Sequence, residues 1–204
     1  MKKLILSLTV VVALALSANA QTEKGKWILG GAAAYESGKS GADAKASQSL
    51  SIIPNIGYFV SDNFALGTGI GYSYQKTGFS SSTGQNSAVV INPFGRYYVS
   101  LSDQFKFFGQ ASVPLSFGTV KSVDVNGNTG AKTGSSTSIE VALSPGFAFF
   151  PTKKIAVQLA LAGIAYRNYS VEDASGDEIA NAGYESFSIG TNFFAPQVGI
   201  QFHF

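Results

Sequence analysis

The chain has 204 residues, with 14 Lys and Arg against 12 Asp and Glu, and it contains no cysteine. The lack of cysteine excludes disulfides, so stability must come from backbone pairing and burial. Lys2 and Lys3 account for the basic excess, and the balanced remainder does not favour nucleic-acid binding, which needs clustered positive charge.

Residues 1–20 have the pattern of a cleaved secretory signal peptide. Two lysines precede the apolar run Leu4 to Ala18, and Ala18-Asn19-Ala20 supplies a small-residue cleavage site. The run has 15 residues, fewer than the roughly 20 of a membrane-spanning helix, so the alternative of an anchor helix is less favoured. We therefore predict an export signal at 1–20 and one domain at 21–204.

Apolar residues alternate with small or polar ones in eight segments of the remaining chain, which predicts strands with one apolar face. In chain order these segments are residues 27–35, 50–58, 64–74, 89–99, 105–117, 139–150, 155–166 and 193–204. The last segment ends on Phe204, an aromatic residue on the apolar face of its strand.

The connections between the predicted strands alternate in length. Three are short and centred near Asp62, Leu101 and Thr152, whereas four are long and polar, at about 37–47, 77–86, 121–136 and 170–186. Short turns at one end and long loops at the other are typical of an outer-membrane barrel. Prolines interrupt four of the strands, and we expect bulges or broken pairing there because proline has no N–H to donate: Pro54, Pro93, Pro145 and Pro196.

The two faces of the strands differ in kind. The apolar face carries bulky aromatic residues, while the other face carries Gly, Ala and Ser with a few polar groups, including Arg96, Lys106 and Glu140. This suits a narrow polar lumen surrounded by lipid. We expect Arg96 and Lys106 to face each other near one end, with Asp103, the terminal carboxylate or water between them, and Glu140 to lie too far along its strand to help.

Together the signal sequence, eight amphipathic segments and terminal aromatic resemble the small outer-membrane β-barrel family of OmpA-type and OmpX-type domains. The resemblance covers residues 25–204 and implies an all-β, eight-stranded antiparallel up-and-down transmembrane β-barrel in the cell outer membrane. It also implies that Phe202 and Phe204 form the signal read by the barrel-assembly machinery. Outer-membrane lipid would be the other partner.

Four features could carry chemistry, and for each a structural interpretation is favoured. The first feature, His203, lies beside the terminus. The second, the glycines of residues 67–72, does not complete a phosphate loop, since position 72 is Tyr. Residues 124–135 fail the EF-hand pattern at Thr129 and Ser135. The acidic residues of 170–186 are expected to keep a loop soluble, with loose divalent-cation binding as the alternative. We predict no catalytic, cofactor or metal residues.

The function predicted from these observations is a structural or surface-interaction role for a barrel with a plugged lumen and no enzymatic activity. The alternative is a minor channel or transporter for small or apolar solutes. A soluble periplasmic ligand-binding barrel, with its apolar face inward, is the rival at the level of fold. What the long loops bind is not encoded in any motif of the sequence.

Overall fold

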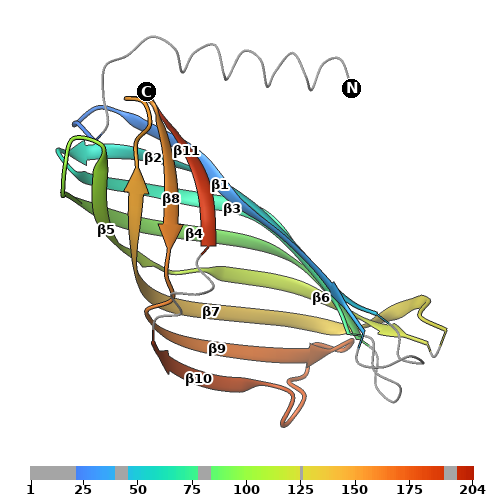
Figure 1. The fold of residues 1–204 in the computed structure, drawn as a ribbon. Coiled ribbons are helices and arrows are strands. Elements are labelled where there is room, and N and C mark those ends of the chain that lie inside the picture. Colours follow the sequence, from blue (N-terminus) through green and yellow to red (C-terminus); the bar gives the residue numbers. More distant parts are fainter. Residues whose placement is uncertain (1–21, 40–45, 78–83, 125, 191–196) are drawn as a thin grey trace.

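The computed structural model describes residues 22–39, 46–77, 84–124, 126–190 and 197–204, and these residues form an all-β structure (Figure 1). Its strands are β1 (Trp27–Gly38), β2 (Ser47–Ser61), β3 (Phe64–Lys76), β4 (Gly84–Ser100), β5 (Phe105–Ser112), β6 (Leu115–Val123), β7 (Thr129–Phe149), β8 (Ile155–Ala160), β9 (Ile164–Asp173), β10 (Tyr184–Ile189) and β11 (Gln197–His203). In this part of the chain there is no helix of the length and hydropathy needed to span a membrane.

The strands make eight crossings of one barrel, because three crossings consist of two strands each: β5 with β6, β8 with β9, and β10 with β11. At the end that carries the short turns, the order around the wall is β1, β2, β3, β4, β5, β7, β8 and β11. Antiparallel pairing of β11 with β1 then closes the ring, from Ile28 with His203 to Gly31 with Ile200. The predicted eight-stranded antiparallel up-and-down barrel is confirmed.

Breaks in the ladders accompany the prolines. The register between β2 and β3 passes from Ile52 to Asn55 without pairing Pro54 on that side. Strand β4 changes its partner from β6, up to Ile91, to β5, from Phe94 onward, so Pro93 lies at the change. The expected interruption is therefore confirmed at Pro54 and Pro93.

Pro145 occupies an equivalent position in β7. This strand pairs with β9 up to Leu143 and with β8 from Gly146 onward. The carbonyl of Pro145 accepts a hydrogen bond from the Leu161 amide at 2.9 Å, so the acceptor of the proline is still used. Pro145 confirms the expectation a third time, whereas Pro196 lies outside the described residues.

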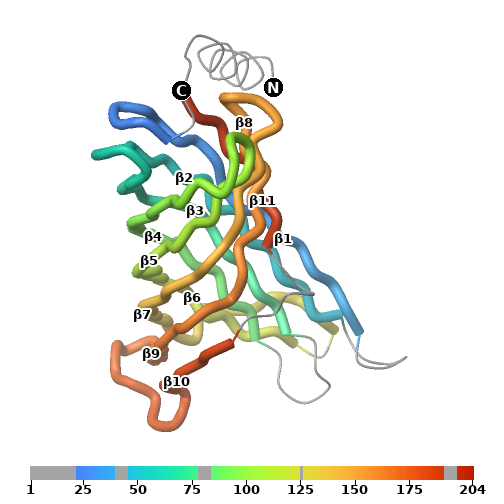
Figure 2. Tube along the Cα trace, turned by 60° about the vertical axis from the view of Figure 1, so that its left-hand side comes forward, coloured from blue at the N-terminus to red at the C-terminus, as the bar shows by residue number. Residues whose placement is uncertain are grey.

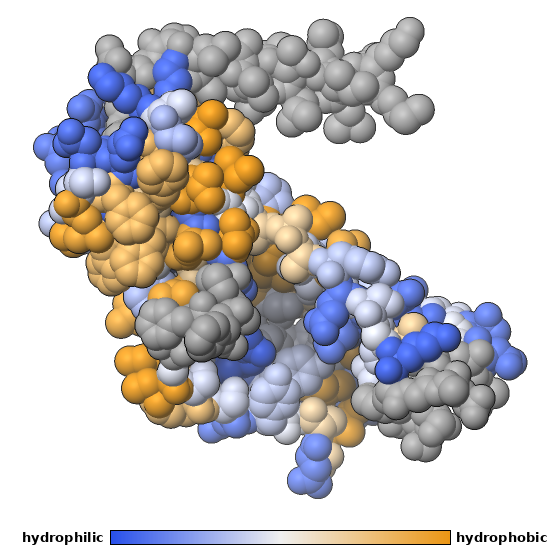
Figure 3. All heavy atoms as spheres, in the orientation of Figure 1, coloured by the Kyte–Doolittle hydropathy of each residue, from blue (hydrophilic) through white to orange (hydrophobic). Residues whose placement is uncertain are grey.

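The apolar face of the strands points away from the barrel interior, as predicted. Leu66, Ile70 and Tyr72 are exposed along β3, and Val141 and Leu143 are exposed along β7. The space-filling view shows apolar side chains gathered over β5, β7 and β8 (Figure 3). Eight of the buried apolar side chains instead form a cluster inside the ring at the short-turn end, and its members are Ile28, Phe59, Ala65, Tyr98, Phe108, Ala148, Phe150 and Ala156.

All four predicted long loops contain strand residues at their edges, and the last two contain the most. Strand β6 runs to Val123 and β7 begins at Thr129, so residues 121–136 are mostly a hairpin. The predicted last loop likewise contains the end of β9 and the start of β10 at Tyr184. The sequence prediction missed these extensions because both faces of the strands are polar there, and an apolar alternation cannot reveal such a strand.

Candidate functional site: the sealed end of the barrel and its open wall

Arg96 of β4 is only 4% exposed and lies in the barrel interior near the short-turn end. Its side chain forms hydrogen bonds across the interior. Its Nε donates to Gln110 Oε1 of β5 at 2.9 Å. Its Nη1 donates to Gln158 Oε1 of β8 at 2.8 Å and to Gln201 Oε1 of β11 at 3.0 Å. We call Arg96 and these three glutamines the plug, because they join strands around the ring across the interior.

The expected arrangement of Arg96 and Lys106 is wrong. Arg96 is paired in register with Gln110, and Lys106 with Ser100, so the two cations do not face each other. The turn is centred near Asp103 rather than Leu101, and Ser102 Oγ accepts a hydrogen bond from the Phe105 amide at 3.1 Å within it. Buried Lys106 instead donates from Nζ to Ser100 Oγ at 2.7 Å.

The charge of Arg96 is balanced by dipoles and aromatic faces, whereas Asp103, the terminal carboxylate or water had been expected beside it. No carboxylate of the described residues forms a salt bridge with it. Its guanidinium carbon lies 4.4 Å from the ring centroid of Phe108, and Nη1 also donates to Tyr98 Oη at 3.2 Å. A desolvated cation over an aromatic face gains about 2 kcal/mol or more, and amide oxygens accept the N–H groups that burial would otherwise leave unpaired.

An aromatic layer seals the barrel beside the plug, and we call it the aromatic floor: Phe59, Tyr98, Phe108, Phe150 and His203. The His203 ring is fully buried, with its centroid 5.1 Å from that of Phe150 and 5.8 Å from that of Phe59. Sequence reasoning treated the lumen as polar and missed this layer. The alternation held the signal, because Phe59, Phe108 and Phe150 occupy the positions that face inward.

Glu140, the third predicted lumen residue, lies further from the short-turn end and pairs with Arg167 of β9. The Arg167 Nε donates to Glu140 Oε2 at 2.6 Å. Sequence reasoning correctly separated Glu140 from Arg96 but did not identify Arg167, whose place opposite Glu140 follows from the register of β7 with β9. The interior therefore has two polar clusters, one sealed at the short-turn end and one toward the long-loop end.

The wall is not continuously paired toward the long-loop end. Among the described residues, β10 pairs with β9 and not with β1, and Ala32 to Gly38 of β1 pair with β2 but not with β10 or β11. Both views show β10 lying along β9 and apart from β1 (Figures 1 and 2). A hollow is visible in the middle of this face of the molecule (Figure 3). This stretch of the wall, where the described residues of β1 and β10 are not paired with each other, is here called the open seam.

A register difference accompanies the open seam. Ile189 of β10 is opposite Ile164, and Gln197 of β11 is opposite Ala160. From 189 to 197 is eight residues, while from 164 back to 160 is four, so the last crossing contains four more residues than its neighbour over this interval. The alternation changes phase across this interval, because the outward residues are odd-numbered in β10, as Ile189 is, and even-numbered in β11, as Val198 and Ile200 are.

Two cavities flank the wall beside this offset. The inner one, of about 470 Å³, is lined by polar and small residues that include Glu140, Ser144, Arg167 and Ser188. The outer one, of about 450 Å³, is a groove with a largely apolar lining that includes Phe107, Leu143, Pro145 and Ile164. The cavities are on opposite faces of the same few strands.

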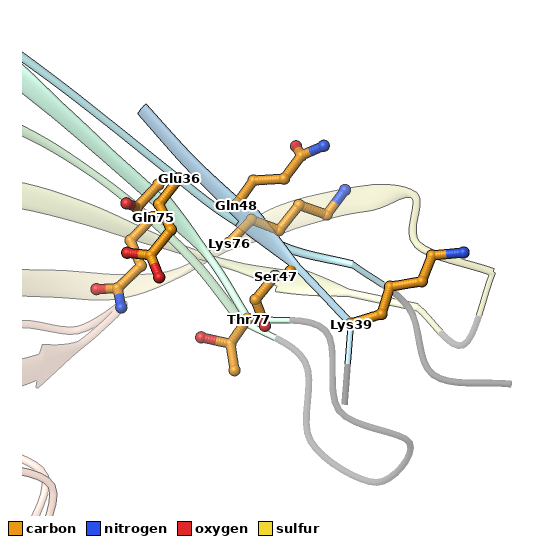
Figure 4. A pocket seen from close by; sticks show the side chains of 9 residues that line it. Glu36, Lys39, Ser47, Gln48, Gln75, Lys76 and Thr77 are labelled. Atoms are coloured by element: carbon orange, nitrogen blue, oxygen red, sulfur yellow. The ribbon is translucent and has the colours of Figure 1, made fainter. Parts of the chain in front are cut away.

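A third hollow, of about 500 Å³, lies at the long-loop ends of β1, β2 and β3. Figure 4 shows its side chains extending in several directions from the strands, with Lys39 and Lys76 not converging on one point. Lys76 Nζ donates to the Gly127 carbonyl at 2.6 Å, which ties the β6–β7 turn to β3. The Lys76 ammonium group in this hollow therefore has a structural role.

The β6–β7 turn uses its acidic residue internally. Asp124 Oδ1 accepts hydrogen bonds from the amides of Asn126 and Asn128 at 2.9 and 2.8 Å. The Asn128 side chain donates to Asp124 Oδ2 at 2.9 Å and, with the Asn128 amide, lowers the pKa of this carboxyl below its usual range. The described ranges contain no cluster of three acidic or histidine groups arranged to hold a metal ion, in this turn or in the acidic β9–β10 turn.

Neither the protein-family models nor the curated proteins give a match to the sequence. Solved structures do match. The outer membrane protein OprG from Pseudomonas aeruginosa aligns over 92% of this chain and 99% of its own, at 11% identity and a TM-score of 0.50. The fold is that of the small outer-membrane barrels.

Two further solved structures are of the same kind. Neisserial surface protein A is 14% identical over 88% of this chain and 97% of its own, with a TM-score of 0.47. The N-terminal β-barrel domain of Pseudomonas aeruginosa OprF is 11% identical over 90% of this chain and 100% of its own, with a TM-score of 0.40. The likeness to OprG, at 11% identity, concerns the fold alone, and in that respect it confirms the resemblance.

Proposed function

We propose that this protein is an integral outer-membrane β-barrel with a structural or surface-interaction role and no enzymatic activity. The outward apolar face of its strands is the observation that carries the proposal. A transmembrane β-strand needs about 9–11 residues, and β2, β3, β4 and β7 have 15, 13, 17 and 21. A soluble ligand-binding barrel would turn this face inward, so the fold-level rival is disfavoured.

The sealed end supports a role without conduction through the barrel. By analogy with other outer-membrane barrels, the short turns face the periplasm and the long loops face outward. The plug and the aromatic floor then close the periplasmic end, and an eight-stranded barrel has an interior just wide enough for such side chains. In this orientation Phe202 and Phe204 are the proposed signal for the barrel-assembly machinery, near the end of the closing strand β11.

The first experiment is fractionation of cells that express the full chain, followed by gel migration of the membrane protein with and without heating. Recovery in the outer membrane with heat-modifiable migration is expected, because a closed barrel resists detergent until it is heated. Recovery as a soluble periplasmic protein would overturn the proposal. Planar bilayer recordings of the purified barrel are expected to show no steady conductance.

A second candidate function is the exchange of small apolar solutes, and the open seam favours it. A solute that enters from the long-loop end meets the plug below but an unpaired wall at its side. Lateral passage into the membrane would then require no conduction through the sealed end. Faster uptake of a labelled apolar solute by cells that express the barrel, with no bilayer conductance, would favour this function over a purely structural one.

A further inference from the structure

The inner cavity and the outer groove have five lining residues in common, so they meet at one place in the wall. The shared residues come from β7, from the junction of β8 with β9, and from the end of β10: Ser144, Gly163, Ile164, Ile189 and Gly190. A wall residue of a barrel normally faces either the lumen or the membrane. Here one set of residues lines both sides.

The strands at this place in the wall are irregular. Strand β8 ends at Ala160 and β9 begins at Ile164, while the ladder of β7 on this side passes from Leu143 to Gly146 without pairing Ser144. On its other side Ser144 pairs with Gln110 of β5. Gly163 lies so close to β7 that a Cβ there would overlap the Leu143 carbonyl oxygen, so no side chain fits at this position. On this side of β7 no ladder of the described residues separates the two cavities, and the strands are joined there by the hydrogen bonds from the Leu161 amide to the Pro145 carbonyl and from the Gly190 amide to the Gly163 carbonyl.

The polarities of the two cavities are opposite. The groove offers Phe107, Leu143, Pro145 and Ile189 to whatever contacts the outer wall. The inner cavity offers the Glu140 carboxylate as an acceptor and the Arg167 guanidinium as a donor, already joined at 2.6 Å. Each cavity has a volume in the range of ligand pockets, about 300–1,000 Å³.

We infer that this place in the wall binds a single-chain amphiphile, with its alkyl chain in the outer groove and its polar head in the inner cavity beside Glu140 and Arg167. The inference rests on the membrane location proposed above, because only then is the groove surrounded by acyl chains. It deepens the second candidate function by naming the class of ligand and the site. Neither the polar inner cavity nor the apolar outer groove alone would select an amphiphile. The two together select one, because they share lining residues in the wall.

The ion pair determines the kind of head. Glu140 and Arg167 are already paired with each other, so a charged head would have to break this ion pair to gain a counter-ion. An uncharged head that both donates and accepts hydrogen bonds, such as a hydroxyl, can bond to either partner without breaking the pair. The ligand class is therefore a long-chain alcohol or a similar neutral amphiphile.

The test uses the full mature barrel in phosphatidylcholine nanodiscs with a photoactivatable probe, 1-dodecanol that carries a diazirine in its chain. A dodecane with the same diazirine is the control probe. Saturable labelling of the peptides around Leu143 to Pro145 and Ile164 by the alcohol, competed by excess dodecanol and weaker with the alkane, is expected. Equal labelling by both probes would show ordinary contact with membrane chains and would overturn the inference.

Matched variants separate the groove from the rest of the wall. A Cβ added at Gly109 meets no atom within 4 Å, so Gly109→Leu fills the groove without a clash. This variant is expected to lower alcohol labelling by about tenfold or more, a factor equivalent to 1.4 kcal/mol. Ala111→Leu, on the same outward face but outside the groove, is expected to leave the labelling unchanged. Unchanged labelling in Gly109→Leu would contradict the site.

A double variant tests the head. Glu140→Leu with Arg167→Met removes both partners, so no unpaired charge is left behind. It is expected to reduce the labelling by the alcohol to that by the alkane. Heat-modifiable migration of each sample separates the two proposals: a folded, membrane-inserted barrel without groove labelling overturns the site alone, whereas a chain that does not enter the membrane overturns the proposed function as well.

Discussion

Arg96 Nη1 lies 3.0 Å from Gln201 Oε1, although the two residues are 105 positions apart in the chain. Their strands, β4 and β11, are four places apart in the ring of eight, which places them on opposite sides of the barrel. One side chain thus joins the two halves of the closed end, in addition to the ladder bonds of the wall. The plug is therefore a structural element as well as a barrier.

Arg96→Met is expected to destabilise the barrel by about 1–3 kcal/mol, because the amide oxygens of buried Gln158 and Gln201 lose their charged donor. The measurement is the urea midpoint of unfolding in detergent, with Lys121→Met in β6 as the control for losing a charge. Similar midpoints for the two variants would contradict a stabilising plug.

Phe108→Ala is expected to cost more, about 3–5 kcal/mol, since it removes a fully buried ring from the aromatic floor. The control is Phe117→Ala, which truncates a ring that is half exposed on the outward face. The same unfolding assay applies. A cost for Phe117→Ala equal to that for Phe108→Ala would show that the floor is no better packed than the outer surface.

The fold could be predicted from the sequence because the apolar alternation is strong wherever one face of a strand meets an apolar surrounding. Leu66, Ile70 and Tyr72 show this in β3, and the parity of each short hairpin agreed with it. The polar ends of β6 and β7 could not be predicted in the same way, because neither face there is apolar. The prediction was therefore limited by the strength of the apolar alternation and not by the length of the strands.

The site was less predictable, for two physical reasons. The β4–β5 turn decides which residue is opposite Arg96, and a change of turn centre from Leu101 to Asp103 moves its partner from Lys106 to Gln110. The open seam depends on a register offset between crossings, which no local pattern of residues encodes. Neither the partner of a residue nor the phase of the alternation is preserved across such an offset, as outward Ile189 in β10 and outward Val198 in β11 show.

Gly67→Val is expected to prevent the chain from forming a heat-modifiable barrel. A Cβ at Gly67 would overlap the Ile56 carbonyl oxygen and come into close contact with the Phe94 ring, so the wall cannot accept a branched side chain there. Gly84→Val is the control, because a Cβ at Gly84 meets no atom within 4 Å. Refolding yields measured by gel migration check both variants, and a normal yield for Gly67→Val would disprove the close packing of β3 against β2.

The β6–β7 turn is expected to loosen in acid. The Asn128 side chain and amide hold the pKa of Asp124 below its usual value, so the carboxylate stabilises the turn fully above the unfolded pKa of about 3.9. That stabilisation is lost as the pH falls through the lower folded pKa, because protonation weakens the acceptor. The Asn128 amide proton shift, followed by NMR in micelles, should titrate with a midpoint below about 3.9. Asp124→Asn should abolish the titration, and a midpoint at or above the unfolded value would show that the hydrogen bonds do not favour the charged form.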